Sequence, residues 1–267
     1  MVNRKKFFIC DEYTRGIARL AAESTGRSEL ARLCQRMYIA DYINLDGIDL
    51  WLAKNALTTL FQVLKKYPAL RGYVNYFGSL NGLASRKDDL FAYLHPSSDS
   101  YVRDRFKKQS DELVASARVT LDGAGLAMAF YYYIGPYKFS GIILDENDFD
   151  ERKVLKNIEY SSKIGYSPEG CISCRSIIDH EIGHLLDFSL SLSSSSEFKK
   201  IIGRYNADYI GKNLSMYCVE TGKIDYAEVI AEGFSEFRNN GTPRCIAREI
   251  GELIDREYKI QEAYMNQ

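Results

Sequence analysis

The stretch Ile178–Asp187 reads IDHEIGHLLD, and the rest of the chain is best interpreted from it. It contains the pattern H-E-x-x-H. On an α-helix, residues four positions apart lie one turn apart on the same face, so the imidazoles of His180 and His184 can point to one place. A zinc ion takes two such nitrogens at about 2.0–2.1 Å. Glu181 lies at the edge of this face, where its carboxylate can reach a water molecule on the metal.

Apolar residues recur at helical spacing around the pattern: Ile177, Ile178, Ile182, Leu185 and Leu186. This periodicity predicts a half-buried helix from about Ser173 to Leu190. The chain has three histidines, and two of them belong to this pattern, which favours a metal site over chance. The alternative is a helix with two surface histidines and a glutamate in a salt bridge. A third ligand decides between the two interpretations.

A second helical segment, Tyr226–Phe237, carries a row of carboxylates. Glu228, Glu232 and Glu236 recur every four residues and share one stripe. A solvated acidic face is one interpretation. The residues between them are largely apolar, however, which indicates a substantially buried helix. Buried carboxylates need a partner such as a cation or a metal, so a functional role is favoured.

Together these two segments resemble the gluzincin metallopeptidases, specifically the branch like anthrax lethal factor. That branch pairs H-E-F-G-H-x-x-D with a later E-F-F-A-E-A-F. Here His180–Asp187 reads HEIGHLLD and Glu228–Phe234 reads EVIAEGF. The separation of 44 residues (228 minus 184) is also similar. The resemblance covers the chain from about Asp46 to the C-terminal end of the sequence and leaves residues 1–44 outside.

The resemblance implies roles for three carboxylates. Glu228 is then the third zinc ligand, and Asp187 and Glu232 hold the ligand imidazoles in their metal-binding tautomer. It also implies a zincin-like fold, in which a mixed sheet packs on the active-site helix and its edge strand pairs with an extended substrate. Gly141–Asp145 is the segment expected to form that edge strand.

One position departs from the pattern of the family. In the lethal-factor branch a tyrosine seven residues before the third ligand can bond the oxyanion, but here Thr221 stands there. Tyr217 lies in the matching segment, with a loop four residues longer, and is the candidate; Tyr226 is the reserve. The metzincin alternative fails because its extended motif needs Gly and His where Asp187 and Leu190 stand.

The activity implied by the resemblance is zinc-dependent endopeptidase hydrolysis of a protein or peptide substrate. Glu181 is expected to take a proton from a zinc-bound water and to deliver it to the leaving amine. The alternative is a non-catalytic, metal-stabilised scaffold with a structural or binding role. The stretch Gly165–Arg256 is similar to domains of phage head-associated and mobile-element proteins, which suits a virion component. The intact Glu181 favours the enzyme, because a scaffold needs ligands but no general base.

The remaining sequence predicts an α+β protein. Residues 1–44 are expected to form a helical N-terminal extension, and residues 45–267 a zincin-like metallopeptidase domain with a small mixed sheet and a C-terminal helical subdomain. Leu126–Tyr133 and Gly141–Asp145 are expected to form a hairpin. Residues 149–174 are predicted to be a loop-rich approach to the H-E-x-x-H helix.

Composition narrows the function further. The formal charge is 35 minus 36, or −1, so nucleic-acid binding is not expected; a DNA-binding regulator remains a third option because arginines are scattered through the N-terminal segment. The chain has no run of about 20 apolar residues and no export signal, so an intracellular location is expected, with phage association or non-classical release as alternatives. Cys171 and Cys174 form a CxxC pair. Reduced thiols are favoured over a second zinc site, which would need two more ligands.

Overall fold

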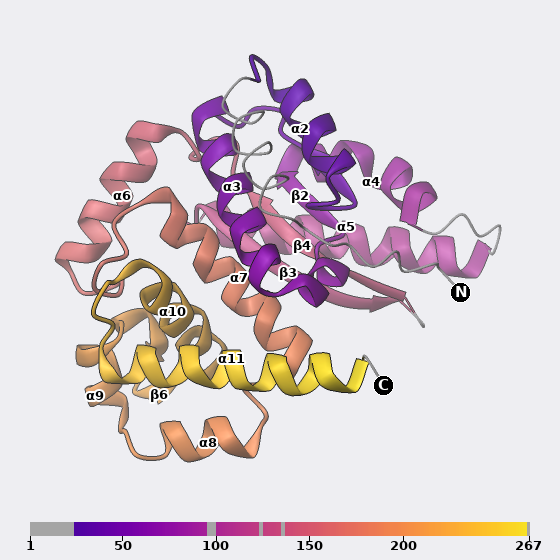
Figure 1. Cartoon of the computed structure of the whole chain (residues 1–267). Helices are drawn as coiled ribbons and strands as arrows, with labels where there is room; N and C mark the ends of the chain where they lie inside the picture. The colour runs from indigo at the N-terminus through magenta and orange to yellow at the C-terminus, as the bar shows by residue number, and fades with distance from the viewer. Residues whose placement is uncertain (1–23, 95–99, 123–124, 135–136, 266–267) are drawn as a thin grey trace.

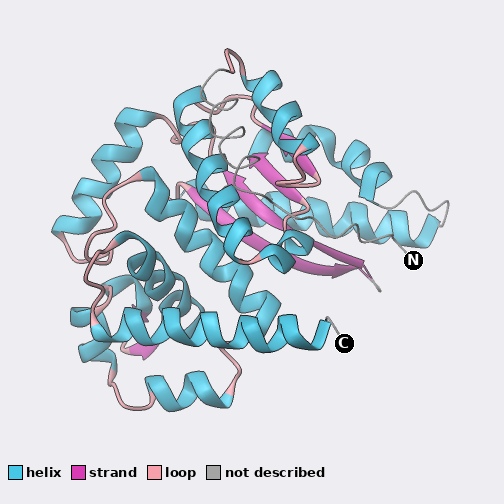
Figure 2. Ribbon diagram, in the orientation of Figure 1, coloured by secondary structure: helices cyan, strands magenta, loops and turns pink. Residues whose placement is uncertain are grey.

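The computed structural model describes residues 24–94, 100–122, 125–134 and 137–265. A four-stranded sheet lies in the middle, helices cover both of its faces, and a helical C-terminal part lies beside it (Figure 1). Figure 2 shows that helix predominates, that most of the strand residues lie in the central sheet, and that a separate short hairpin lies among the C-terminal helices. The predicted α+β class, with a small mixed sheet, is confirmed.

The sheet has the strand order β1-β2-β4-β3. β1 (Tyr42–Asn44), β2 (Tyr76–Ser79) and β4 (Tyr137–Leu144) are parallel, and β3 (Ala127–Ile134) runs antiparallel to β4. The prediction of an edge strand at residues 141–145 is therefore wrong, because β4 lies between β2 and β3. β3 forms the edge. The physical reason is burial: residues 142–144 are fully buried on both faces, as in an interior strand.

One face of the sheet packs on α3 (Leu50–Lys66) and α7 (Cys174–Leu190). Phe77, Ile142 and Leu144 point to this face and share one apolar core with the two helices. α7 is the H-E-x-x-H helix, and its bounds match the predicted ones. The sheet therefore lies directly against the helix that carries both histidines.

The opposite face packs on α4 (Leu80–Leu94) and α5 (Ser100–Asp122). Tyr76, Phe139 and Ile143 point to this second face and form a separate core with the two helices. Adjacent residues of β2 and β4 thus serve different cores, as the period of two along a strand requires.

The C-terminal part is helical, as predicted. Its elements are α8 (Ser196–Ile202), α9 (Ala207–Asn213), the one-turn helix η2 (Met216–Cys218), the short hairpin β5–β6 (Val219–Glu220 and Lys223–Ile224), α10 (Tyr226–Asn239) and α11 (Cys245–Met265). α10 lies along α7, and α11 packs against both of them (Figure 1).

The predicted N-terminal extension is described from residue 24 onward; residues 1–23 lie outside the described ranges. α2 (Arg27–Arg36) buries Leu30 and Cys34 in the same core as α3. β1 then pairs with β2. The predicted boundary between residues 44 and 45 accordingly falls at the end of a strand of the main sheet.

A helix replaces the first half of the predicted loop at residues 149–174. α6 (Glu151–Lys163) begins after Asp150, whose carboxylate accepts hydrogen bonds from two amides of the first turn. Val154 and Ile158 are its buried residues, and most of its remaining side chains are exposed or half-buried. Such a narrow apolar stripe gives a weak helical signal in sequence.

Candidate metal centre

α7 places the two histidines of the H-E-x-x-H pattern one turn apart on its inner face. The Nε2 atoms of His180 and His184 lie 3.2 Å from each other. Their side chains are 17% and 14% exposed, so solvent can reach them. The prediction that both imidazoles point to one place is confirmed by these distances.

α10 brings a carboxylate to the same place. The Asp225 side chain accepts hydrogen bonds from the amides of Ala227 and Glu228, and this cap fixes the first turn of α10. Glu228 Oε2 lies 3.4 Å from His180 Nε2, and Glu228 Oε1 lies 3.5 Å from His184 Nε2.

Close packing of α7 on α10 makes this approach possible. Gly183 faces Ala231, and a Cβ atom at Gly183 would lie 2.6 Å from the Ala231 Cα. A glycine at the second variable place of the H-E-x-x-H pattern therefore lets the two helix backbones approach closely. This close contact between the helices determines how near the Glu228 carboxylate comes to the two histidines.

The three side chains fit a zinc ion. Two ligands at about 2.0–2.1 Å from a tetrahedral ion lie about 3.3–3.4 Å apart. The two Nε2 atoms are 3.2 Å apart, Glu228 Oε2 lies 3.4 Å from His180 and Glu228 Oε1 lies 3.5 Å from His184, and each of these distances is close to that value. With one ligand atom taken from each residue, the three atoms lie within 4.8 Å of one another. In addition, Glu228 Oε2 is buried and has no hydrogen-bond partner. A buried carboxylate oxygen of this kind calls for a cation. Within the described ranges, His180, His184 and Glu228 form the one group of ligand-type residues arranged to hold a metal ion.

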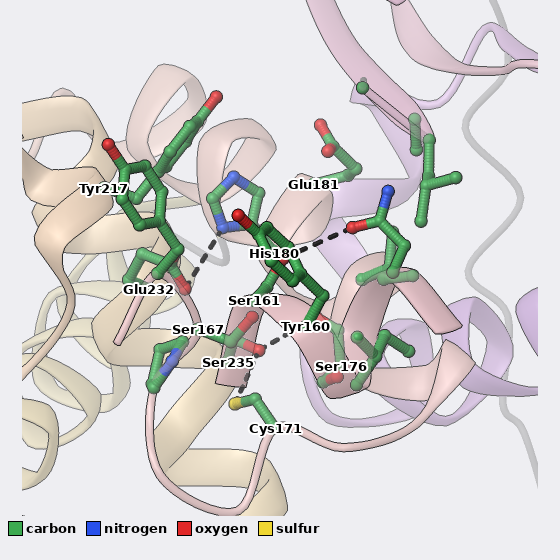
Figure 3. Close-up of a pocket in the computed structure, with 18 of the residues that line it drawn as sticks. Tyr160, Ser161, Ser167, Cys171, Ser176, His180, Glu181, Tyr217, Glu232 and Ser235 are labelled. Carbon is green, nitrogen blue, oxygen red and sulfur yellow. Dashed lines mark hydrogen bonds and ion pairs between the residues drawn. The ribbon is translucent and has the colours of Figure 1, made fainter. Parts of the chain in front are cut away.

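Further carboxylates surround the histidines. Glu232 Oε2 lies 3.6 Å from His180 Nδ1 (Figure 3). Glu228 faces the other ring nitrogen of His180, Nε2. Burial alone lowers the pKa of His180, but Glu232, Glu181 and Glu228 outweigh it and raise this pKa to about 10. Burial raises the pKa of Glu228, yet the adjacent imidazoles dominate and hold it below its usual value. The centre thus carries an excess of negative charge that favours a bound cation.

The side chain of Glu181 extends from α7 to the edge strand β3. Its Oε2 accepts a hydrogen bond from the backbone amide of Ala129, at 2.5 Å. Burial raises the pKa of Glu181, and the two histidines and this amide offset the shift only in part. A buried carboxylate with a raised pKa beside a metal site has the properties of a general base. The amide of Ala129 was not singled out by the sequence, because strand order decides its position.

The structure brings Tyr217, and not Tyr226, to the histidines. The Tyr217 ring lies 6.0 Å from the His180 ring and is 49% exposed. Burial and the carboxylates Glu228 and Glu181 raise the pKa of Tyr217, so its hydroxyl stays protonated. The Tyr226 ring instead packs edge-on against Phe198 of α8.

Asp187 lies on α7 one turn beyond the metal-binding turn. It is buried, and its Oδ1 accepts a 2.7 Å hydrogen bond from the amide of Ser193. Burial raises its pKa, and the bonds from Ser193 and the charge of His184 oppose this shift. Its described contact with His184 is thus electrostatic, while its hydrogen bond holds the loop that follows α7.

A cavity of about 730 Å³ opens beside the candidate base. Its walls are the inner face of α6, the start of β3, the loop at residues 166–171 and the first turns of α7. His180, Glu181 and Tyr217 line its inner end (Figure 3). The volume is within the range of small-ligand and side-chain sites, about 300–1,000 Å³. The sequence did not predict this cavity because α6 was not recognised.

Cys171 of the CxxC pair lines this cavity, whereas Cys174 is buried in the apolar core. Among the described residues, neither cysteine belongs to a group arranged to hold a metal ion. Cys171 Sγ lies 3.2 Å from the Ser235 hydroxyl, which itself donates to the carbonyl of Ser176. Burial raises the pKa of both Cys171 and Cys174 to about 12, which keeps the thiols protonated. Both cysteines are free thiols.

Comparison with known proteins finds no family model, no curated protein and no solved structure that matches this chain. Among the described residues, no helix has the length and apolar character needed to cross a bilayer. The functional assignment therefore depends on the side chains themselves.

Proposed function

We propose that this protein is a zinc-dependent endopeptidase with a zincin-like fold. The observation that carries the proposal is the convergence of His180, His184 and Glu228: the two Nε2 atoms lie 3.2 Å apart, and each lies 3.4–3.5 Å from one of the two Glu228 carboxylate oxygens. Three protein ligands leave a fourth position for water, which is characteristic of catalytic rather than structural zinc. The antiparallel strand β3 beside the histidine helix, and the glutamate on a second helix, support the zincin-like interpretation.

Three residues of the chain would carry the chemistry around the metal. Zinc, when bound, supplies Lewis acidity, which makes a water molecule nucleophilic and polarises the scissile carbonyl. Glu181 removes the proton from the attacking water and passes it to the leaving amine. Tyr217 donates its hydroxyl proton in a hydrogen bond to the developing oxyanion. Glu232 keeps His180 oriented through its Nδ1 side.

The edge strand β3 offers a binding place for an extended peptide. The Ala129 amide points away from β4, because its donor bond goes to Glu181 rather than into the sheet. A peptide added beside β3 would accept this bond through its own carbonyl. Glu181 is then released from the strand and becomes free to act on water. Binding of the substrate and freeing of the base are thereby linked.

The first experiment is metal content by inductively coupled plasma mass spectrometry. Protein purified without chelators is compared with Glu228→Ala, and hydrolysis of a proteome-derived peptide library is measured on both. We expect about one zinc per chain in wild type, loss of zinc in Glu228→Ala, and cleavage by wild type only. Glu181→Gln should keep zinc and lose cleavage. No zinc uptake by wild type would overturn the metal site, whereas bound zinc with no cleavage would favour the non-catalytic scaffold.

A further inference from the structure

Four aromatic rings gather on the far side of the metal ligands from the α6 cavity. We define them as the aromatic cluster: Tyr73 from the short 3₁₀ helix η1 (Pro68–Tyr73), Tyr131 and Tyr133 from β3, and Phe188 from α7. The Tyr131 ring is stacked between the rings of Phe188, at 5.2 Å, and Tyr73, at 6.0 Å. The Tyr133 ring meets Tyr131 edge-on at 4.9 Å. The cluster therefore joins the edge strand to the histidine helix.

The cavity, the candidate base and the aromatic cluster follow one another in the same order along α7 and along β3. On both elements the cavity residues come first, at Ile177 and Ala127. The pair Glu181 and Ala129 follows, joined by its hydrogen bond. The cluster comes last, with Phe188 one turn beyond the second histidine. Cavity, candidate base and aromatic cluster thus lie in sequence along one line.

Part of the cluster is open to solvent. Tyr133 is 57% exposed, and the other three rings are half-buried. Lys138, the cross-strand partner of Tyr133, places its ammonium 2.8 Å from the Tyr73 hydroxyl. The stacked rings are fixed by their neighbours, so a ligand that meets their free edges binds a preformed surface.

Strand geometry places a bound peptide on this surface. An added strand pairs better in the antiparallel sense, which puts its N-terminal end toward the C-terminal end of β3. Tyr131 and Tyr133 are two and four residues beyond Ala129, about 7 and 13 Å along the strand. Residues directly opposite each other share a face. Gln109 already donates to the Tyr133 carbonyl, so backbone pairing ends near Tyr131, while the Tyr133 side chain remains reachable.

We propose that the aromatic cluster binds the substrate segment N-terminal to the cleaved bond. Take the substrate residue that lies opposite Ala129 as the reference. The cluster selects aromatic or large apolar side chains at the substrate residues two and four positions before this reference, which lie opposite Tyr131 and Tyr133. Ring contacts favour such side chains, and the Lys138 ammonium disfavours Lys and Arg at the same places. The inference deepens the proposed peptidase function and rests on it for the position of the cleaved bond.

The test measures binding separately from hydrolysis. Zinc-loaded Glu181→Gln protein is titrated into fluorescein-labelled glycine–serine peptides that carry Phe, Ala or Lys at two positions two residues apart, and binding is followed by fluorescence anisotropy. We expect the Phe peptide to bind more tightly than the Ala peptide by about 3- to 10-fold, and the Lys peptide to bind least. Adding Tyr133→Ala should remove most of the preference for Phe.

Tyr132→Ala is the matched control. Tyr132 is the neighbouring tyrosine on the same strand, but it is half-buried and packs toward Phe130 and α5 on the opposite face of the sheet. The preference for Phe should survive in this variant. Two results would overturn the proposal that the aromatic cluster binds substrate: equal binding of the three peptides, or the same loss of the preference for Phe in both tyrosine variants. Preferential binding without hydrolysis by wild type would support the surface and count against the peptidase function.

Discussion

The α7–α10 helix pair buries carboxylates in opposite ways near the C-terminal end of α10 and near its N-terminal end. At one end, Asp179 bonds Arg238 at 2.7 Å, and Glu236 bonds Arg244 at 2.6 Å. Both carboxylates are fully buried, and each has a fixed guanidinium partner. At the other end, Glu181, Glu228 and Glu232 face two histidines, and within the described chain no lysine or arginine forms an ion pair with any of the three.

This difference separates a structural role from a chemical one. A carboxylate held by arginine has its charge balanced permanently and ties two elements together. A group of carboxylates balanced only by imidazoles leaves charge for a cation that can be gained or lost. The row Glu228, Glu232 and Glu236 on α10 thus divides into a proposed metal ligand, an imidazole partner and an arginine partner.

The largest expected effect is loss of the metal. His184→Ala should reduce the zinc content from about one per chain to nearly none, because two ligands seldom hold zinc against dilution. Arg238→Ala, at the arginine end, should keep the metal if the protein folds. Both are measured by mass spectrometry of protein freed of loosely bound ions. A zinc content near one per chain in His184→Ala would show that His184 is not a ligand of the metal.

A second effect concerns stability at the arginine end. Arg244→Ala leaves the Glu236 carboxylate buried and unpaired, and should lower the free energy of unfolding by about 3–5 kcal/mol in urea titration. Arg86→Ala is the control, since the Arg86–Asp89 pair is exposed and should contribute less than about 1 kcal/mol. Glu228→Gln, studied without zinc, should cost less than Arg244→Ala. The opposite order would mean that the two ends do not differ as described.

The contact between the helices can be tested with one methyl group. Gly183→Ala places its Cβ against the Ala231 backbone, and should lower the free energy of unfolding by about 1–3 kcal/mol and weaken zinc binding. Gly211→Ala, in α9, is the matched control because its Cβ would lie 3.8 Å from the Val219 side chain in β5, which is an ordinary van der Waals contact. That variant should be neutral or stabilised by up to about 1 kcal/mol. Equal behaviour of the two variants would exclude close helix packing as a determinant of the site.

The smallest expected effect is on the CxxC pair. Cys171→Ser combined with Cys174→Ser should leave the zinc content unchanged, because neither thiol joins the metal centre. In a Cys10→Ser background, titration with a disulfide reagent at pH 8 should modify Cys245 rapidly. Cys171 and Cys174 should react slowly, because their pKa of about 12 leaves little thiolate at that pH. Zinc lost on replacing this pair would show that a second site exists.

Local periodicity accounts for the part of the site that could be predicted. The histidine helix was expected at 173–190 and is found at Cys174–Leu190, because its apolar spacing and its ligand spacing both follow the helical turn. Glu228 was chosen from the carboxylate stripe and the family resemblance, and the distances bring it to the histidines.

Non-local pairing accounts for what could not be predicted. The position of β4 between two other strands depends on partners more than 60 residues apart, such as Tyr76 and Gly141. A signal was present nonetheless: Ile142, Ile143 and Leu144 form an unbroken apolar run, which is typical of an interior strand. β1 was missed because three residues are too few to show a period. The cavity depends on α6, whose apolar stripe is only two residues wide.

The separation of the ligands along the chain has a further consequence for the lifetime of the protein. An ion bound by both His184 and Glu228 would link two positions 44 residues apart (228 minus 184). It would act as a reversible cross-link that closes the segment with α8, α9 and the β5–β6 hairpin into a loop. Cross-links that close loops of this size contribute about 3–4 kcal/mol by restricting the unfolded chain. Chelation should therefore open this segment to trypsin. Under the proposed peptidase function, a copy without its metal would then become a substrate for copies that retain it.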